Sequence, residues 1–253
     1  MDKNSFMKSL PDENPYKMAK LYEFLERAKD AGYPMATDEF YTPNVWSRVS
    51  SMKDYRDITV LGADFLERRI FVIHPERMEN PLCVAKVDNL DPMHSLKHKD
   101  YLGSLMSLGM NRERFGDVVV RGDTGYIVIF RESYSFIREN LHTIGRCGID
   151  ISLLEYEEAL AFLEPTLTME TGIISSLRLD AVVALIARTS RSKALDALSS
   201  GNVLLNYNVV RDKSKEIREG DTLTIRGTGK FRIGSIVGTT HKGNLRFEFH
   251  KFE

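Results

Sequence analysis

The most constraining feature of this chain is its C-terminal third, where two short helical patterns are followed by several short strand patterns. Apolar spacing predicts a helix over residues 179–187. Ser190 is suited to cap a second helix that ends near Ser199, and Gly201 is suited to the left-handed position that follows a helix. Strands are expected over residues 203–205, 222–226, 231–237 and 245–249. Because such short helices cannot bury their apolar sides alone, a compact α+β module is expected.

The same third of the chain is basic, whereas the rest is acidic. The formal net charge is −1, yet from Leu177 onward Lys and Arg outnumber Asp and Glu by 14 to 8. Before Leu177 the acidic residues outnumber the basic ones by 28 to 21. A basic module on an acidic body is expected when one domain binds a polyanion. Chance partition of charge would look the same, so a motif is needed to decide.

The remainder of the chain is expected to form two further α+β parts. Residues 1–75 combine a helical pattern over 15–31 with a strand pair at 58–61 and 70–73, which predicts an N-terminal α/β region. Residues 76–160 show patterns in the order β-α-β-β-α-β, which is typical of a ferredoxin-like, RRM-like domain. The expected order is completed by two segments, a connector over 161–176 and the C-terminal module over 177–253.

Two interpretations are open for the strand near residue 128. Strand alternation places Tyr126, Val128 and Phe130 on one face of the sheet. RNA-recognition modules expose stacking aromatic residues on such a face, but helices covering it would make these residues core, which we favour. Three arginines near the preceding strand also allow two interpretations, because they could contact RNA or support the structure: Arg112, Arg114 and Arg121.

The C-terminal module carries a motif that resembles the S4 (αL) RNA-binding domain. The matching residues are Arg178-Leu179-Asp180, Ser190-Arg191, Ala194, Gly201, Val203, Asn206, Gly220-Asp221 and Arg226-Gly227. Their spacings fit the family pattern without gaps. The chain departs from the pattern at Tyr207-Asn208, where many S4 domains carry a glycine after the asparagine.

This resemblance and the basic charge together predict an RNA-binding surface that reads RNA shape more than sequence. Arg191 and Lys193 begin a helix whose N-terminal amides favour phosphate, and Arg178 begins the neighbouring helix. Asp180 is expected to orient arginines, because a carboxylate facing phosphate would repel it. The predicted RNA-binding residues are Arg178, Leu179, Asp180, Ser190, Arg191, Lys193, Asn206, Arg211, Lys213, Arg226 and Lys230.

A wider resemblance covers residues 70–253. The segment LKHKDYLGSLMSLGMNRERFGDVVV at 96–120 and the tail Arg226-Gly227-Thr228-Gly229-Lys230-Phe231 are similar to signatures of the YlmH family. These bacterial proteins join a middle RNA-binding domain to a C-terminal S4 domain, and their genes lie near cell-division genes. The resemblance implies binding to rRNA or tRNA on the ribosome, and related S4 proteins bind large subunits that carry peptidyl-tRNA after failed translation.

No motif predicts catalysis, a metal or a cofactor. Arg178-Leu179-Asp180 resembles the catalytic motif of pseudouridine synthases, but no synthase-sized domain follows it. His94 and His98 lack a third metal ligand, and Gly227–Lys230 lacks the Ser or Thr that a phosphate-binding loop requires. We therefore expect a non-catalytic protein. The rivals are an RNA-modifying enzyme with its active site in residues 1–160 and a division-associated factor whose acidic body binds proteins.

The chain has the features of a cytoplasmic protein. The N-terminal residues MDKNSFMKSLPDENP contain no apolar signal region, and no segment approaches the roughly 18 apolar residues of a membrane helix. Cys83 and Cys147 lie far apart in the sequence and are expected to be reduced thiols, a disulfide being the less favoured alternative.

Overall fold

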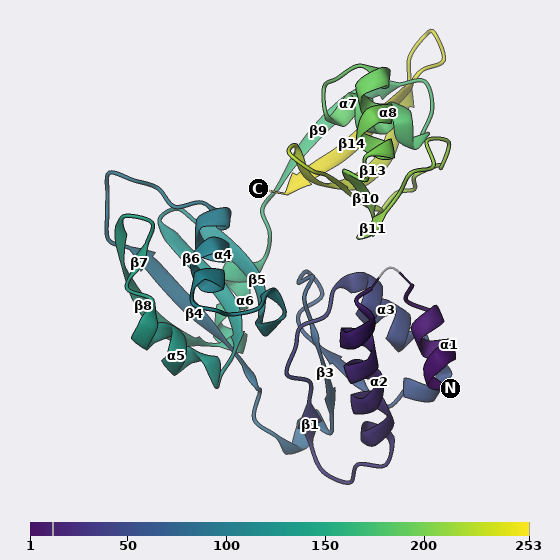
Figure 1. Cartoon of the computed structure of the whole chain (residues 1–253). Coiled ribbons are helices and arrows are strands. Elements are labelled where there is room, and N and C mark those ends of the chain that lie inside the picture. Colours follow the sequence, from purple (N-terminus) through teal and green to yellow (C-terminus); the bar gives the residue numbers. More distant parts are fainter. Residues whose placement is uncertain (12, 253) are drawn as a thin grey trace. The chain divides into compact units, whose positions relative to one another are not determined.

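The structure is a computed structural model that describes residues 1–11 and 13–252. The chain divides into two compact units, Met1–Glu164 and Pro165–Glu253 (Figure 1). Each unit combines helices with antiparallel sheet, so the chain is an α+β protein, as predicted. No helix in the described residues has both the length and the apolar character needed to span a bilayer.

The first part of unit 1 packs helices on a small sheet of strand order β1-β3-β2. Helix α2 begins as the sequence predicts, because Asn14 caps it by accepting the Lys17 amide and Pro15 occupies its first turn. The strand pair expected at 58–61 and 70–73 is confirmed, since β2 and β3 pair antiparallel. The elements are α1 (Lys3–Lys8), α2 (Pro15–Lys29), β1 (Met35–Ala36), α3 (Pro43–Ser50), η1 (Lys53–Tyr55), β2 (Thr59–Leu61), β3 (Ile70–Ile73) and η2 (Pro75–Arg77).

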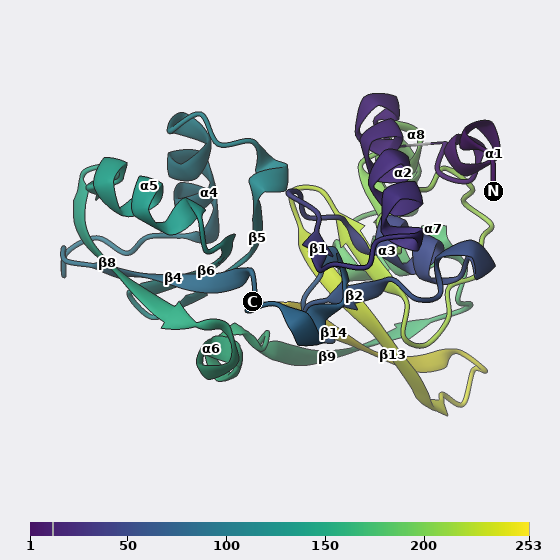
Figure 2. The same ribbon diagram turned by 90° about the horizontal axis from the view of Figure 1, so that it is seen from below.

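The second part of unit 1 has the predicted order β-α-β-β-α-β, extended by a short strand and a further helix. Its antiparallel sheet runs β5-β6-β4-β8-β7, the strand arrangement of a ferredoxin-like domain. Helices α4 and α5 cover one face and α6 lies on the other (Figure 2). The elements are β4 (Leu82–Asn89), α4 (His98–Ser107), η3 (Arg112–Arg114), β5 (Phe115–Arg121), β6 (Thr124–Phe130), α5 (Ser133–Asn140), β7 (Thr143–Ile144), β8 (Cys147–Glu155) and α6 (Tyr156–Leu163).

The face of this sheet that carries Tyr126, Val128 and Phe130 is core, as we favoured. The three side chains are at most 7% exposed. The Tyr126 ring stacks on Phe162 of α6 with centroids 4.9 Å apart, and Phe130 packs against Phe40 at 4.8 Å. The surface on which RNA-recognition modules stack bases is therefore covered by other segments of the same unit.

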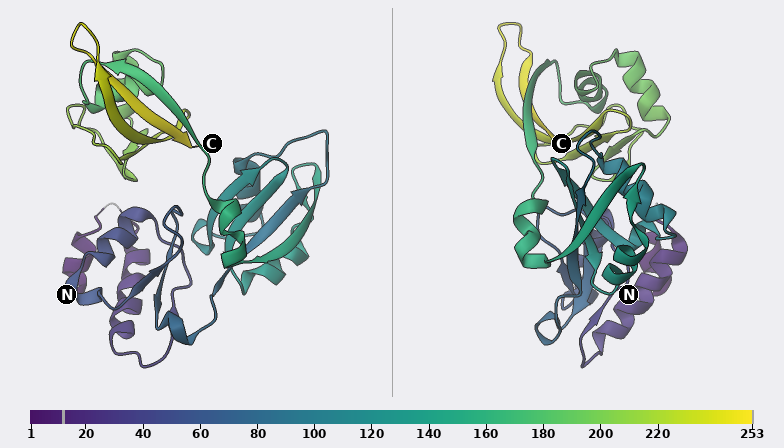
Figure 3. Two further views of the ribbon diagram at one scale, coloured as in Figure 1. Left: turned by 180° about the vertical axis from the view of Figure 1, so that it is seen from behind. Right: turned by 90° about the vertical axis from the view of Figure 1, so that its left-hand side faces the viewer.

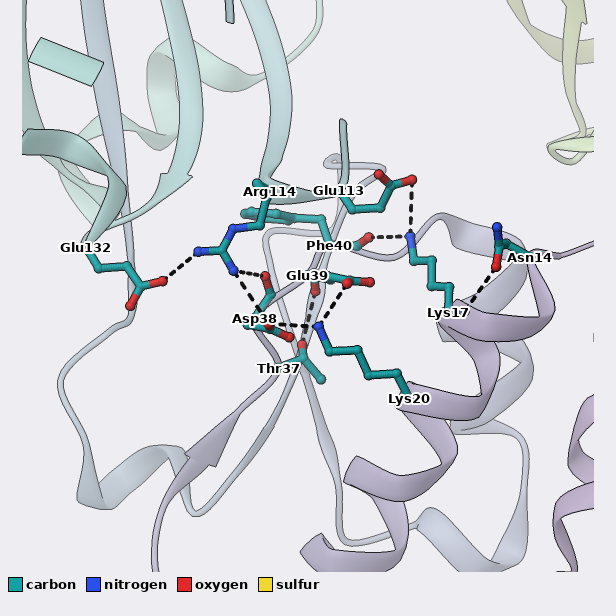
Figure 4. Close-up of polar contacts among 10 residues, drawn as sticks. All are labelled: Asn14, Lys17, Lys20, Thr37, Asp38, Glu39, Phe40, Glu113, Arg114 and Glu132. Atoms are coloured by element: carbon teal, nitrogen blue, oxygen red, sulfur yellow. Dashed lines mark hydrogen bonds and ion pairs between the residues drawn. The ribbon is translucent and has the colours of Figure 1, made fainter. Parts of the chain in front are cut away.

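Polar contacts hold the N-terminal part against the ferredoxin-like sheet (Figure 4). Lys17 of α2 lies 3.6 Å from the Glu113 carboxylate in η3. Arg114 donates to the backbone carbonyl of Asp38 at 2.7 Å and to the Glu132 carboxylate at 2.8 Å. The Lys17–Glu113 and Arg114–Asp38 contacts join segments about 75 to 95 residues apart in sequence, whereas the Arg114–Glu132 contact lies within the ferredoxin-like part.

Unit 2 is a six-stranded antiparallel sheet of order β11-β10-β12-β13-β14-β9. Helices α7 and α8 cover one face of it (Figure 3, the light-green helices beside the yellow strands). Their buried residues, such as Leu179, Val183 and Leu198, share one core with Leu223, Phe247 and other residues of the sheet. The elements are β9 (Leu167–Ile174), α7 (Leu179–Ile186), α8 (Arg191–Ser199), β10 (Val203–Leu205), β11 (Asn208–Val209), β12 (Thr222–Ile225), β13 (Gly229–Thr239) and β14 (Leu245–Phe252).

The prediction that residues 161–176 form a connector is wrong. Its first residues end α6, and most of the remainder forms β9, which pairs with β14 from Leu167↔Phe252 to Ile174↔Leu245. The sequence of β9 has no continuous apolar run, because one of its faces is partly solvent-exposed. Only pairing with a strand nearly 80 residues later orders it, which local patterns do not encode.

Candidate RNA-binding surface

The beginnings of α7 and α8 meet at the carboxylate of Asp180. Arg178, the N-cap of α7, donates from Nε to Asp180 Oδ1 at 3.1 Å, and Arg191 Nε lies 3.7 Å from Asp180 Oδ2. The Asp180 side chain is 9% exposed, whereas those of Arg178 and Arg191 are 40% and 56% exposed. The carboxylate thus faces two guanidiniums that remain open to solvent, which is the orienting arrangement expected for Asp180.

The electrostatics of this group favour a charged carboxylate. Burial alone would raise the pKa of Asp180, but the hydrogen bond from Arg178 and the positive charges of Arg178 and Arg191 outweigh burial and lower the pKa. Asp180 therefore stays ionised at neutral pH and offsets the repulsion between the two arginines. The arginines in turn keep their outward N–H groups for a further anion.

The start of α7 is anchored by the chain segment that precedes β12. The amides of Leu179 and Asp180 donate to the carbonyls of Lys215 and Lys213, at 2.8 Å and 3.2 Å. These two helix amides therefore donate their hydrogen bonds within the protein. The Lys213 and Lys215 side chains are exposed, and their backbone lies beside the arginine pair. Lys213 is thus an exposed cation whose backbone contacts the start of α7.

The start of α8 is capped by Ser190. Its hydroxyl accepts the backbone amide of Lys193 at 3.3 Å, so the residue has a structural task whether or not RNA is bound. Lys193 lies in the first turn, and its residue is exposed. With Arg178, Arg191 and Lys213 it completes a group that we call the helix-end surface.

Two predicted cations lie at the other end of α8. Gly201 has φ +70°, the left-handed conformation expected from the sequence, and the Arg211 guanidinium lies against it. The amide of Arg226 donates to the Asn202 carbonyl at 2.9 Å. Arg211 and Arg226 are therefore separated from Arg191 by the length of the helix.

Two predicted RNA contacts have other roles in the structure. Leu179 is fully buried in the core of unit 2, so its side chain cannot reach RNA. The side-chain amide of Asn206 is used at both ends, donating to Asp221 at 2.8 Å and accepting from the Thr222 amide at 2.9 Å. Both residues therefore stabilise the fold of unit 2.

Lys230 lies on a different face from the helix-end surface. Its neighbour Phe231 points into the core beneath the helices, so alternation along β13 places Lys230 on the opposite face. Its Nζ is 4.1 Å from the centroid of the Phe252 ring and 5.4 Å from that of Tyr207. No local sequence pattern marks these two rings as binding residues, because only the folded sheet and its turn bring them to the lysine.

The three arginines of the ferredoxin-like part support structure. Each guanidinium donates to a backbone carbonyl of unit 1 at 2.7 Å: Arg112 to residue 115, Arg114 to residue 38 and Arg121 to residue 162. Nearby, His94 Nδ1 lies 2.8 Å from the Asp91 carboxylate. Among the described residues no three His, Cys, Asp or Glu side chains are grouped so as to hold a metal.

A small antiparallel sheet carrying two short helices, with the R-L-D and S-R positions meeting at one carboxylate, defines an S4-domain protein. The S4 domain family model matches residues 177–223. A second model, described as "Putative RNA-binding domain in YlmH", matches residues 75–158. Together the two matches support the YlmH family of S4 RNA-binding proteins for this chain.

Two individual proteins are similar to the chain. "Ribosome-associated protein quality control protein P2" of Bacillus subtilis (strain 168) is 29% identical over 227 residues, which cover 87% of this chain and 88% of that protein. Among solved structures, "Cell division protein ylmH from Streptococcus pneumoniae" matches with a TM-score of 0.45 and 16% identity, over 55% of this chain and 89% of that one.

Proposed function

We propose that this chain is a non-catalytic, cytoplasmic RNA-binding protein that acts on the ribosome, where unit 2 contacts structured rRNA or tRNA. The observation that carries the proposal is the pair of solvent-open arginines held by the buried Asp180 carboxylate. Guanidiniums that are already oriented lose less side-chain entropy on meeting phosphate than free ones do. Shape recognition suits such a surface, because it presents charge to the RNA backbone.

The ribosomal part of the proposal extends to large subunits left behind by failed translation. It is supported by the name of the Bacillus subtilis relative, a ribosome-associated quality control protein that covers most of this chain. The family match to both the middle domain and the S4 domain supports a shared domain organisation. A large subunit that retains a tRNA offers both of the RNA classes that the proposal names.

Co-sedimentation with purified large subunits, with and without bound peptidyl-tRNA, tests the proposal. The double substitution Arg178→Ala/Arg191→Ala should lower affinity at least about tenfold, since charge-assisted contacts are typically worth about 1.5–3 kcal/mol each. The matched control is Lys53→Ala/Arg56→Ala, which removes the same charge from exposed positions of unit 1. Equal affinity for the two variants, with both folded, would refute the assignment of this surface.

Two further measurements separate the rival functions. Pull-down of partners with and without ribonuclease separates RNA-mediated association from direct protein binding by the acidic body. Comparison of modified nucleosides in rRNA and tRNA from cells with and without the protein tests the enzyme alternative. We expect association to depend on RNA and the modification pattern to be unchanged; loss of one specific modification would overturn the non-catalytic proposal.

A further inference from the structure

The face of the unit 2 sheet away from α7 and α8 carries a second group of cations. In β13, Phe231 and Ile233 are buried in the core beneath the helices. Alternation therefore places Lys230 and Arg232 on the opposite, outer face. The register of β13 with β14 adds further residues to this face: Arg232 pairs with His250, and Phe252 follows two positions later. We call Lys230, Arg232, His250, Phe252 and the adjoining Tyr207 the outer-face cluster.

Aromatic rings and cations are in direct contact within the outer-face cluster. Lys230 Nζ lies 4.1 Å from the Phe252 centroid and 5.4 Å from the Tyr207 centroid, and Arg232 Cζ lies 5.5 Å from the Phe252 centroid. Arg232 is exposed, and the two rings are partly exposed. Met169, which pairs with His250 from the neighbouring strand β9, is 60% exposed and extends the apolar surface.

The backbone at Tyr207 is strained in a way that supports this surface. Tyr207 has φ +68° and Asn206 has φ +48°, in the two-residue turn between β10 and β11. A residue with a bulky side chain is uncommon in this left-handed region, where glycine is preferred. The tyrosine at this position therefore costs backbone energy and brings a ring to Lys230.

We propose that the outer-face cluster binds an unpaired stretch of RNA, with a base stacking on Phe252 or Tyr207 and the flanking phosphates contacting Lys230 and Arg232. This inference rests on the proposed function and adds a single-stranded segment to the structured RNA met by the helix-end surface. Cations interleaved with aromatic rings are the usual means of holding single strands, because every base has a stacking face and every nucleotide a phosphate.

The electrostatics of Lys230 agree with a phosphate ligand. Burial lowers the pKa of Lys230 to about 8, helped by the positive charge of Arg232. A phosphate placed between the two cations would offset both effects. Glu248, the acidic residue on this face of β14, precedes His250 by two residues, whereas Phe252 follows His250 by two residues. The carboxylate and the Phe252 ring therefore lie on opposite sides of His250 along the strand. An acidic peptide would contact the cations and leave the rings unused, whereas a nucleotide engages both.

The test compares two RNAs on the full chain: a closed hairpin, and the same hairpin with an unpaired 3′ extension carrying 2-aminopurine. Wild-type protein should prefer the extended RNA and quench its fluorescence. Phe252→Leu should lower affinity for the extended RNA about tenfold and leave affinity for the closed hairpin unchanged. Phe136→Leu, which changes an exposed phenylalanine of unit 1, is the matched control and should keep the preference.

A second variant separates loss of binding from loss of folding. Tyr207→Gly relieves the backbone strain, so its Tm should be maintained or raised while the preference for the extension falls. The inference is wrong if the Phe252→Leu and Tyr207→Gly variants both keep the full preference for the extended RNA and quench its fluorescence as wild type does. The Arg178→Ala/Arg191→Ala variant should bind both RNAs more weakly than wild type. If it binds both RNAs with wild-type affinity, the proposed function is wrong, whether or not the protein prefers the extended RNA.

Discussion

At the scale of single residues, Asp180 organises the candidate site without being able to bind phosphate itself. Its carboxylate contacts Arg178 and Arg191, which begin two different helices. The R-L-D and S-R segments lie about a dozen residues apart in the sequence, and the Asp180 carboxylate contacts one arginine of each. Each arginine is therefore positioned by the fold and not only by its own backbone.

Replacing Arg191 should weaken RNA binding more than replacing Lys242. Arg191 is oriented by Asp180, whereas Lys242 is exposed in the turn between β13 and β14 and can stay hydrated when RNA binds. We expect Arg191→Ala to raise the Kd roughly tenfold or more and Lys242→Ala to change it by about twofold at most. Titrations at two salt concentrations, with circular dichroism to check folding, measure this. Equal losses would mean that total charge alone drives binding.

Asp180→Asn should reduce both stability and RNA affinity. The pKa of Asp180 is lowered in the folded state, so its ionisation stabilises the fold above the unfolded pKa of about 4, and this contribution is lost as pH falls through the lower folded pKa. The variant should be about 1–2 kcal/mol less stable at pH 7. The difference from wild type should shrink below pH 4 in urea unfolding. A constant difference from pH 7 to pH 2 would contradict this role.

At the scale of elements, close approaches of side chains to glycine decide how helices sit on sheets. In β6, a Cβ added to Gly125 would lie 2.3 Å from the Tyr101 ring of α4. The glycine therefore lets the helix bury its tyrosine directly on the strand. Gly148 of β8 is the contrasting case, because nothing lies within 4 Å of its missing Cβ.

Gly125→Ala should destabilise unit 1 by about 1–3 kcal/mol, since the added methyl forces the buried Tyr101 ring to move. Gly148→Ala is the matched control within the same sheet and should be neutral or slightly stabilising. Thermal or urea unfolding of the two variants measures the contrast. Similar stabilities for both would show that the ring adapts at little cost.

At the scale of the whole molecule, an acidic body and a basic C-terminal third form separate compact units. The boundary of unit 2 matters for any fragment, because β9 pairs with β14 along eight residue pairs. A fragment that begins at Leu177, as the motif alone would suggest, lacks this strand. It leaves the backbone of β14 unpaired on the edge that β9 occupies.

We expect residues 165–253 to fold and to bind structured RNA with an affinity that falls steeply with salt, as counterion release requires. Residues 177–253 should be markedly less stable, with a Tm lower by about 10 °C or more, because an edge strand and its contacts are lost. Thermal unfolding and filter binding of both fragments measure this. Binding confined to residues 1–164, or independent of salt, would contradict the placement of the RNA surface on unit 2.

The sequence by itself determined the features that depend on neighbouring residues. The Ser190 cap, the left-handed Gly201, the ferredoxin-like order of the middle part and the pairing of β2 with β3 follow from local geometry and periodicity. Tertiary structure decided the roles that depend on partners far along the chain. It turned the expected connector into β9, buried Leu179, engaged Asn206, and placed Lys230 on the outer face beside Phe252. The physical reason is that strand order and burial are set by contacts between distant segments, which no local pattern of residues encodes.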